Sequence, residues 1–159
     1  MKTIATWNVN SLKVRLPQVL QWLRENPVDI LALQETKLIN DKFPLSEIKE
    51  AGYHAAFNGQ KTYNGVAILS RYPVVDITIK NPYYEDPQHR IISATVDGIR
   101  IICIYVPNGQ SLDSEKYTYK LEWLDSLYKW VKDECKLYPK LILLGDYNIA
   151  IEEDRKSVV

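Results

Sequence analysis

Cysteine and histidine are scarce in this chain of 159 residues, which has two of each. Cys103 and Cys135 lie far apart within apolar patterns and have no CxxC spacing, so reduced, buried thiols are favoured over a disulfide or a metal-binding pair. His54 and His89 are expected to be ordinary turn or surface residues. The sequence therefore offers no Cys/His cluster.

The chain also lacks a long hydrophobic run and an excess of either charge. No apolar stretch is long enough for a membrane span or a secretory signal, so a cytoplasmic protein is expected. Twenty basic and twenty acidic residues give a formal net charge of zero. This balance argues weakly against non-specific coating of duplex DNA, but a small cleft needs only local Lys and Arg to bind phosphates.

What the chain does contain is a globular composition rich in aromatic residues. It is 46% hydrophobic and 25% charged, which is not typical of a disordered or fibrous protein. Four Trp and eleven Tyr supply core material and rings able to stack on bases or sugars. No repeat, low-complexity tract or linker interrupts the sequence, so a single unit is expected.

The first third of the chain predicts a strand, a helix and a second strand. Residues 4–7 form a short apolar strand that ends at Asn8. Residues 11–26 carry apolar side chains at the i, i+3, i+4, i+7 spacing of one helical face, namely Leu16, Val19, Leu20 and Leu23. A nearly continuous apolar strand covers 29–34 and ends at Glu35. This order predicts a right-handed crossover between parallel strands.

The rest of the chain predicts more strands and one long helix. Strands are expected at 65–70, 91–96, 99–106 and 141–144. Asp97-Gly98 is a two-residue type I′ hairpin signal, and both of its arms are apolar on both faces, as in strands that lie between layers. Apolar residues at spacings of three and four predict a helix over 114–137. These elements predict an α/β fold with a layered mixed β-sheet flanked by helices.

Three predicted strands end on polar residues that suit a metal or a phosphate: Asn8, Glu35, and the pair Asp146 and Asn148. Ligands bind beyond the carboxyl ends of strands in α/β sheets, so these side chains converge if the three strands lie side by side and parallel. Asn and Asp are also common turn formers and helix caps, which is the alternative for each residue alone. Glu is not a favoured turn residue, and three coincident strand ends favour a site.

These residue types also suggest the chemistry. Carboxylate and amide oxygens favour a hard cation such as Mg²⁺, with Mn²⁺ as an alternative. A bound Mg²⁺ can polarise a phosphodiester oxygen and stabilise the leaving alkoxide. Asp146 could orient and deprotonate the attacking water. The amides of Asn8 or Asn148, or the hydroxyl of Tyr105, could hold a phosphate oxygen.

Six segments, in order along the chain, resemble the exonuclease III family of abasic-site endonucleases. They are 6–12 (TWNVNSL) followed by Arg15, 33–37 (LQETK), 59–68 (GQKTYNGVAI), 90–92 (RII), 105–109 (YVPNG) and 145–150 (GDYNIA). The resemblance places the chain in the endonuclease/exonuclease/phosphatase superfamily. It implies a DNA repair nuclease, either a 3′–5′ exodeoxyribonuclease or an abasic-site endonuclease, that hydrolyses phosphodiesters in double-stranded DNA with Mg²⁺.

The resemblance also implies roles for individual residues. Glu35 would be the principal Mg²⁺ ligand, with Asn8 beside it, and Tyr105 would contact the scissile phosphate. Asp146 would handle the proton of the attacking water or leaving group and lie at the metal, and Asn148 would hold phosphate or metal. The DNA-facing side would include Lys61, Arg90 and Asn108. Without the resemblance, Lys61 equally suits a solvated loop, Arg90 a surface ion pair and Tyr105 the core.

Members of this family are two-sheet, four-layer sandwiches, and their second half supplies an Asp and a terminal Asp–His pair. The resemblance covers 1–150 as the N-terminal part of the domain, with a short divergent tail at 151–159 and the C-terminal half absent. The chain is thus expected to form roughly half of the sandwich, with an exposed inner sheet face. It is expected to be crippled or inactive alone, since losing one catalytic group costs on the order of 10²–10³ in rate.

Other functions remain open at this point. One is a non-catalytic fragment that binds a partner carrying the second half, or that self-associates through the exposed sheet face. Another is a phosphodiesterase of the same fold that acts on inositol or sphingolipid phosphates, although 59–68 and 105–109 favour DNA. A folded fragment without a function is the third. The sequence does not show whether exonuclease, abasic-site or 3′-phosphatase activity dominates.

Overall fold

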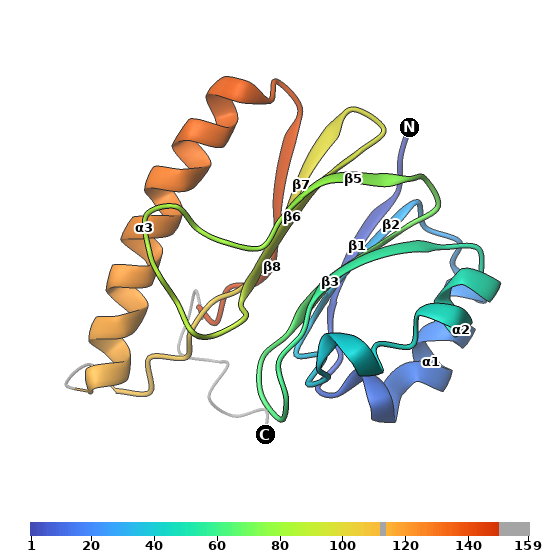
Figure 1. Cartoon of the computed structure of the whole chain (residues 1–159), viewed down its shortest axis with the longest axis horizontal. Coiled ribbons are helices and arrows are strands. Elements are labelled where there is room, and N and C mark those ends of the chain that lie inside the picture. Colours follow the sequence, from blue (N-terminus) through green and yellow to red (C-terminus); the bar gives the residue numbers. More distant parts are fainter. Residues whose placement is uncertain (112–113, 150–159) are drawn as a thin grey trace.

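The first half of the chain builds a four-stranded sheet with helices on its outer face (Figure 1). A computed structural model describes residues 1–111 and 114–149, and the expected tail at 151–159 lies outside them. The elements are β1 (Ile4–Asn8), α1 (Leu12–Glu25), β2 (Ile30–Gln34), the 3₁₀ turn η1 (Asn40–Lys42), α2 (Leu45–Glu50), β3 (His54–Asn58) and β4 (Val66–Ser70). The strand order is β1-β2-β4-β3, with β1 and β2 parallel, as expected for the crossover.

The second half builds another four-stranded sheet, covered by one long helix. Its elements are β5 (Val74–Thr78), β6 (Ile91–Val96), β7 (Ile99–Tyr105), α3 (Glu115–Leu137) and β8 (Leu141–Asp146). The strand order is β5-β6-β7-β8; β7 and β8 are parallel and the other pairs antiparallel. The two sheets pack face to face between α1 and α2 on one side and α3 on the other (Figure 1).

Buried strands alternate their side chains between two layers of core. On β2, Leu31 and Leu33 pack beneath the helices, while Ile30 and Ala32 pack between the sheets. On β7, alternate residues likewise face the other sheet and α3, for example Ile101 and Ile102. This period-two alternation explains why these strands have no polar face.

Local signals in the sequence fix the ends of several elements. The side chain of Ser114 accepts a hydrogen bond from the backbone N–H of Tyr117 and caps α3. Asp97 and Gly98 have φ angles of 47° and 74°, both positive as a type I′ turn requires. The predicted hairpin and long helix are therefore confirmed.

The α/β layered fold class is confirmed, but two expectations about its sheets are wrong. β8 does not lie beside β1 and β2 in one sheet; it is the last strand of the second sheet. The centre of the inner sheet face is not exposed, because strands of the same chain cover it: Ile68, Ile92 and Ile101 are fully buried between the sheets, and only the edge is partly exposed, as at Ile142 and Leu144 of β8. Self-association through an exposed sheet face therefore loses its structural basis. Across the described residues, no helix has the length and apolar character to cross a bilayer.

Candidate active site

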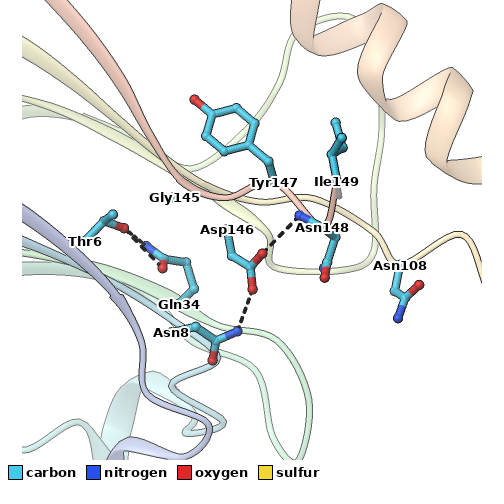
Figure 2. A pocket seen from close by; sticks show the side chains of 9 residues that line it. All are labelled: Thr6, Asn8, Gln34, Asn108, Gly145, Asp146, Tyr147, Asn148 and Ile149. Atoms are coloured by element: carbon cyan, nitrogen blue, oxygen red, sulfur yellow. Dashed lines mark hydrogen bonds between the residues drawn. The ribbon is translucent and has the colours of Figure 1, made fainter. Parts of the chain in front are cut away.

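The ends of four strands bring four polar side chains together. Asn8 donates hydrogen bonds from Nδ2 to Oε1 of Glu35 (3.0 Å) and to Oδ2 of Asp146 (2.8 Å; Figure 2). The hydroxyl of Tyr105 donates to Oε1 of Glu35 (2.8 Å). We call Asn8, Glu35, Tyr105 and Asp146 the polar cluster. The predicted convergence of Asn8, Glu35 and Asp146 is thus present in the structure.

The convergence arises between two sheets and not within one. Parallel pairing places Asn8 opposite Gln34 at the end of β1 and β2, and Tyr105 opposite Asp146 at the end of β7 and β8. β1 and β8 are edge strands of their sheets and contact each other. Face-to-face packing therefore brings the two pairs of strand ends to one rim.

Glu35 and Asn148 adopt a backbone conformation that few residues other than glycine favour. Their φ angles are 54° and 47°; this conformation costs roughly 1–2 kcal/mol for Glu35, whereas asparagine tolerates it better. Backbone hydrogen bonds hold the segment around Glu35: its carbonyl accepts from Ser11 N (2.8 Å), and the next residue, Thr36, donates to Gly65 O (3.1 Å). Strain of this kind gathers at functional sites, where the surrounding structure maintains it.

The partners of Glu35 keep it ionised. Partial burial raises the pKa of Glu35, but hydrogen bonds from Asn8, Lys37 and Tyr105 outweigh this effect and hold the pKa below its usual 4.5. The ammonium Nζ of Lys37 lies 2.9 Å from Oε2 of Glu35 and donates to Oδ1 of Asn10 (2.6 Å). Glu35 is therefore a carboxylate at neutral pH, with a cation already beside it.

The hydroxyl of Tyr105 stays protonated at neutral pH and acts as a hydrogen-bond donor. Burial, together with the neighbouring carboxylate of Glu35, raises the pKa of Tyr105 to about 12. The guanidinium of Arg90 opposes this shift from 4.8 Å above the Tyr105 ring. Tyr105 is thus not simply a core residue, since its hydroxyl reaches the polar cluster.

Asp146 and Asn148 form a tight turn after β8. Oδ1 of Asp146 accepts from the backbone N–H of Asn148 (3.0 Å; Figure 2). Nδ2 of Asn148 donates to Val106 O (2.7 Å), so this amide group already has one partner within the protein. The ammonium of Lys120 donates to Asn148 O (2.6 Å). Burial of this ammonium lowers the pKa of Lys120, although the negative charge of Asp146 acts in the opposite direction. The turn fixes the direction of the Asp146 carboxylate.

Two hollows flank the polar cluster. An open groove of about 790 Å³ runs beside Asp146 and is lined by Thr6, Asn8, Gln34, Asn108, Gly145, Asp146, Tyr147, Asn148 and Ile149 (Figure 2). A second hollow of about 370 Å³ is lined by Gln60, Tyr63, Asn64, Gln88, Arg90, Tyr105, Pro107, Asn108, Lys116 and Tyr119. Asn108 lines both, so the two hollows adjoin and can form one continuous binding surface.

The residues expected on the DNA-facing side lie around these hollows in different ways. Asn108 is exposed and borders both. Arg90 is partly buried, lines the smaller hollow, and donates to Tyr105 O (3.2 Å) and Oε1 of Gln88 (2.9 Å). Lys61 is exposed on the loop between β3 and β4, which contributes other residues to the smaller hollow.

Sequence reasoning assigned no role to Lys37, Lys120 or Gln34, although all three contact this region. Lys37 stands two residues after Glu35, but the contact requires the positive φ angles of both residues, each 54°. Lys120 reaches the site from α3, and no local pattern indicates this contact. Gln34 carried a usable signal, because it is the polar residue that ends an otherwise apolar strand.

The donor set of the polar cluster suits a hydrated hard cation. Two carboxylates and an amide lie together, and within 1–111 and 114–149 no group of three His, Cys, Asp or Glu residues could hold a metal ion. Mg²⁺ commonly takes one or two protein carboxylates and keeps several waters, whereas structural zinc prefers four nitrogen or sulfur ligands. The ammonium of Lys37 already neutralises part of the negative charge beside Glu35.

The chain thus combines a four-layer α/β fold with a polar cluster at the rim between its two sheets, and comparisons identify the family. The model of the Endonuclease/Exonuclease/phosphatase family matches residues 5–157, and the chain belongs to this family. It is 29% identical over 158 residues to exodeoxyribonuclease of Bacillus subtilis and 31% identical over 156 residues to exodeoxyribonuclease III of Haemophilus influenzae. These alignments include 96% and 94% of the chain but 60% and 58% of the relatives.

Solved structures agree with this assignment. The 3′ phosphatase NExo from Neisseria, bound to a product DNA hairpin, is 51% identical with a TM-score of 0.93. An AP endonuclease from Archaeoglobus fulgidus is 43% identical with a TM-score of 0.91. Each match covers 96% of this chain and 60% of the other. The resemblance to the exonuclease III type is confirmed, and the chain spans about 60% of the length of such relatives.

Proposed function

We propose that this chain forms the N-terminal part of a Mg²⁺-dependent DNA phosphodiesterase of the exonuclease III type. The polar cluster carries the proposal: two carboxylates, an amide and a protonated phenol from both sheets lie within hydrogen-bond distance at the edge of an open groove. The names of the relatives, which include exodeoxyribonucleases, a 3′ phosphatase and an AP endonuclease, support DNA as the substrate.

The carboxylates would hold the cation. Glu35 would be the principal Mg²⁺ ligand, with Asn8 beside it and Asp146 and Asn148 on the opposite sheet. The amide of Asn8 would have to turn to offer its oxygen, because Nδ2 donates to both carboxylates and Oδ1 accepts from the backbone N–H of Asn10 (3.1 Å). Mn²⁺ would suit the same oxygen ligands. Bound Mg²⁺ would polarise a phosphodiester oxygen and stabilise the leaving alkoxide. Lys37 would have to share the Glu35 carboxylate with the cation or move away from it, because the Lys37 ammonium contacts this carboxylate.

The other groups would bind phosphate and move the proton. The phenol of Tyr105 would donate to a non-bridging oxygen of the scissile phosphate, since its pKa near 12 keeps it protonated. Asp146 would accept the proton of the attacking water. Hydrogen bonds from Asn8 and from the backbone of Asn148 hold the two oxygens of Asp146 and would orient it for this step.

Double-stranded DNA with abasic sites or 3′ ends is the proposed substrate. Lys61, Arg90 and Asn108 would face it, because they lie on or beside the hollows that flank the polar cluster. The chain has no net charge, so affinity would depend on these local groups and would fall with salt. Location in the cytoplasm stays a prediction.

Full activity is proposed to need more than residues 1–150. The chain spans about 60% of its relatives, and β1 and β8 leave adjacent sheet edges at which a polypeptide corresponding to the remainder could pair. Alone, the chain would cleave slowly or not at all. A non-catalytic fragment that binds such a partner is the second candidate, and these adjacent edges favour it over self-association.

The experiment measures Mg²⁺-dependent cleavage of a duplex with one abasic-site analogue, with and without a co-expressed C-terminal part of a relative. Inositol-phosphate and sphingomyelin substrates run in parallel. With the C-terminal part present, where the variants are compared, we expect cleavage of the DNA substrate and not of the other esters, reduced by about 10²-fold or more in E35Q. E47Q, which changes an exposed glutamate on α2, serves as the matched control. Preference for a non-DNA ester, or equal DNA cleavage by E35Q and E47Q, would rule the proposal out.

A further inference from the structure

One buried amide lies between the sheets directly below the polar cluster. Gln34 ends β2 and is 1% exposed. Ile30 and Ala32, the preceding residues on the same face, belong to the apolar core between the sheets. An apolar side chain would continue this core, whereas a buried amide is tolerated only where hydrogen bonds replace its lost water. The partners of Gln34 therefore indicate what the amide does.

The side chain of Gln34 joins three strands from both sheets. Its Nε2 donates to Oγ1 of Thr6 on β1 (2.9 Å; Figure 2) and to Sγ of Cys103 on β7 (3.3 Å). The Thr6 hydroxyl lies 3.2 Å from Oε1 of the same amide. The bond to Cys103 crosses from the first sheet to the second.

Each of the three strands leads from this hydrogen-bonded group to the polar cluster. Thr6 lies two residues before Asn8, and Cys103 lies two residues before Tyr105, so each pair shares one face of its strand. Gln34 itself directly precedes Glu35. The amide thus connects the strands one residue layer beneath the groups of the proposed site.

We propose that Gln34 is a positioning residue that sets the separation of the two sheets at the polar cluster. Glu35 and Asn8 come from one sheet, and Tyr105 and Asp146 from the other, so the distance between the carboxylates depends on that separation. An apolar replacement preserves the packing but removes the bond to Cys103. The inference rests on the proposed function, because it concerns the geometry in which the carboxylates hold a divalent cation.

Titration of the 159-residue chain with Mn²⁺, followed by EPR, tests this role without an activity assay. Partners behind metal ligands typically contribute about 10–100-fold in affinity, so Q34M should bind Mn²⁺ at least about tenfold more weakly than the wild type. I68V, which trims a fully buried residue of the same intersheet core, should bind like the wild type. Thermal unfolding of both variants verifies that each is folded during the titration.

The outcomes separate this inference from the proposed function. Equal affinity in Q34M and the wild type overturns the inference alone. Absence of Mn²⁺ binding by the wild type, or undiminished binding by E35Q, overturns the proposed function and the inference with it. If Q34M does not fold, Cys103→Val and Cys103→Ser replace it: the Val variant loses the sulfur that accepts from Gln34 across the sheets and should bind weakly, whereas the Ser variant keeps an acceptor there and should retain affinity. Equal affinity in these two variants also overturns the inference.

Discussion

The phenol of Tyr105 donates a 2.8 Å hydrogen bond to the carboxylate of Glu35, although the two residues belong to different sheets. This bond favours the ionised form of Glu35 and the protonated form of Tyr105. The phenol and the carboxylate therefore support each other's protonation state in the free protein.

Removal of the Tyr105 hydroxyl should raise the pKa of Glu35. Y105F takes away one of the three hydrogen bonds that hold this pKa below 4.5, and the carboxyl then stays protonated to a higher pH. NMR titration of the Glu35 side-chain carboxyl measures the shift. Y63F is the matched control, because Tyr63 is 66% exposed and lies on the neighbouring loop. An unchanged Glu35 titration in Y105F would contradict the assigned contact.

Loss of the Lys37 charge should strengthen divalent-cation binding. The ammonium of Lys37 lies 2.9 Å from Oε2 of Glu35 and would repel a second cation there, an effect on the order of 1 kcal/mol at a partly solvated site. K37M should therefore bind Mn²⁺ several-fold more tightly at low salt, as measured by EPR titration. K42M, which removes an exposed lysine of η1, should leave affinity unchanged. Weaker binding by K37M would show that Lys37 instead organises the site.

Glycine is required at position 145, immediately before Asp146. Gly145 has φ +146°, and a Cβ there would lie 1.9 Å from the backbone oxygen of Ile104. G145A should therefore force β7 and β8 apart and cost about 3 kcal/mol or more in the free energy of unfolding. G98A has a positive φ but open space around its Cβ, and should cost about 1–2 kcal/mol. Urea unfolding measures the free energy of unfolding of both variants. Equal losses of stability in G145A and G98A would contradict the close approach of Gly145 to the Ile104 backbone.

A buried ion pair should anchor α3 to the second sheet. Arg100 is 2% exposed and donates to Glu134 (2.6 Å), to the carbonyl of Asp76 (2.6 Å) and to Ser93 (2.8 Å). R100M leaves Glu134 without its charged partner, and breaking such a pair typically costs about 3–5 kcal/mol.

The exposed pair between Lys129 and Asp125 on the same helix provides the comparison. D125N should change stability by at most about 1 kcal/mol, because solvent screens an exposed pair. Urea unfolding measures both variants, and a loss in R100M as small as that in D125N would show that the buried pair contributes little.

Much of the site could be predicted from where strands end. Apolar runs that stop at Asn8, Glu35 and Asp146 indicated the carboxyl ends of strands, and the structure brings all three residues together. The arrangement of the sheets could not be predicted in the same way. A strand that is apolar on both faces must lie between layers, but this pattern is identical for neighbours in one sheet and for strands in facing sheets.

The edge strands and the contact between Glu35 and Lys37 had only weak signals in the sequence, for physical reasons. β3 and β5 are edge strands, and β5 exposes Val75 and Ile77, so its side chains lack a clear alternation between core and solvent. The contact between Glu35 and Lys37 depends on positive φ angles at residues that are not glycine. Such conformations are imposed by surrounding hydrogen bonds and cannot be read from the residue type.

The position of the polar cluster between the two sheets has a mechanical consequence. Because each sheet contributes one carboxylate, a small shear of one sheet over the other would alter the gap between Glu35 and Asp146 without breaking a backbone hydrogen bond within either sheet. The arrangement of the polar cluster can therefore be lost by sliding alone, without unfolding of the chain, and a cation held by both carboxylates would oppose this movement by linking the two sheets.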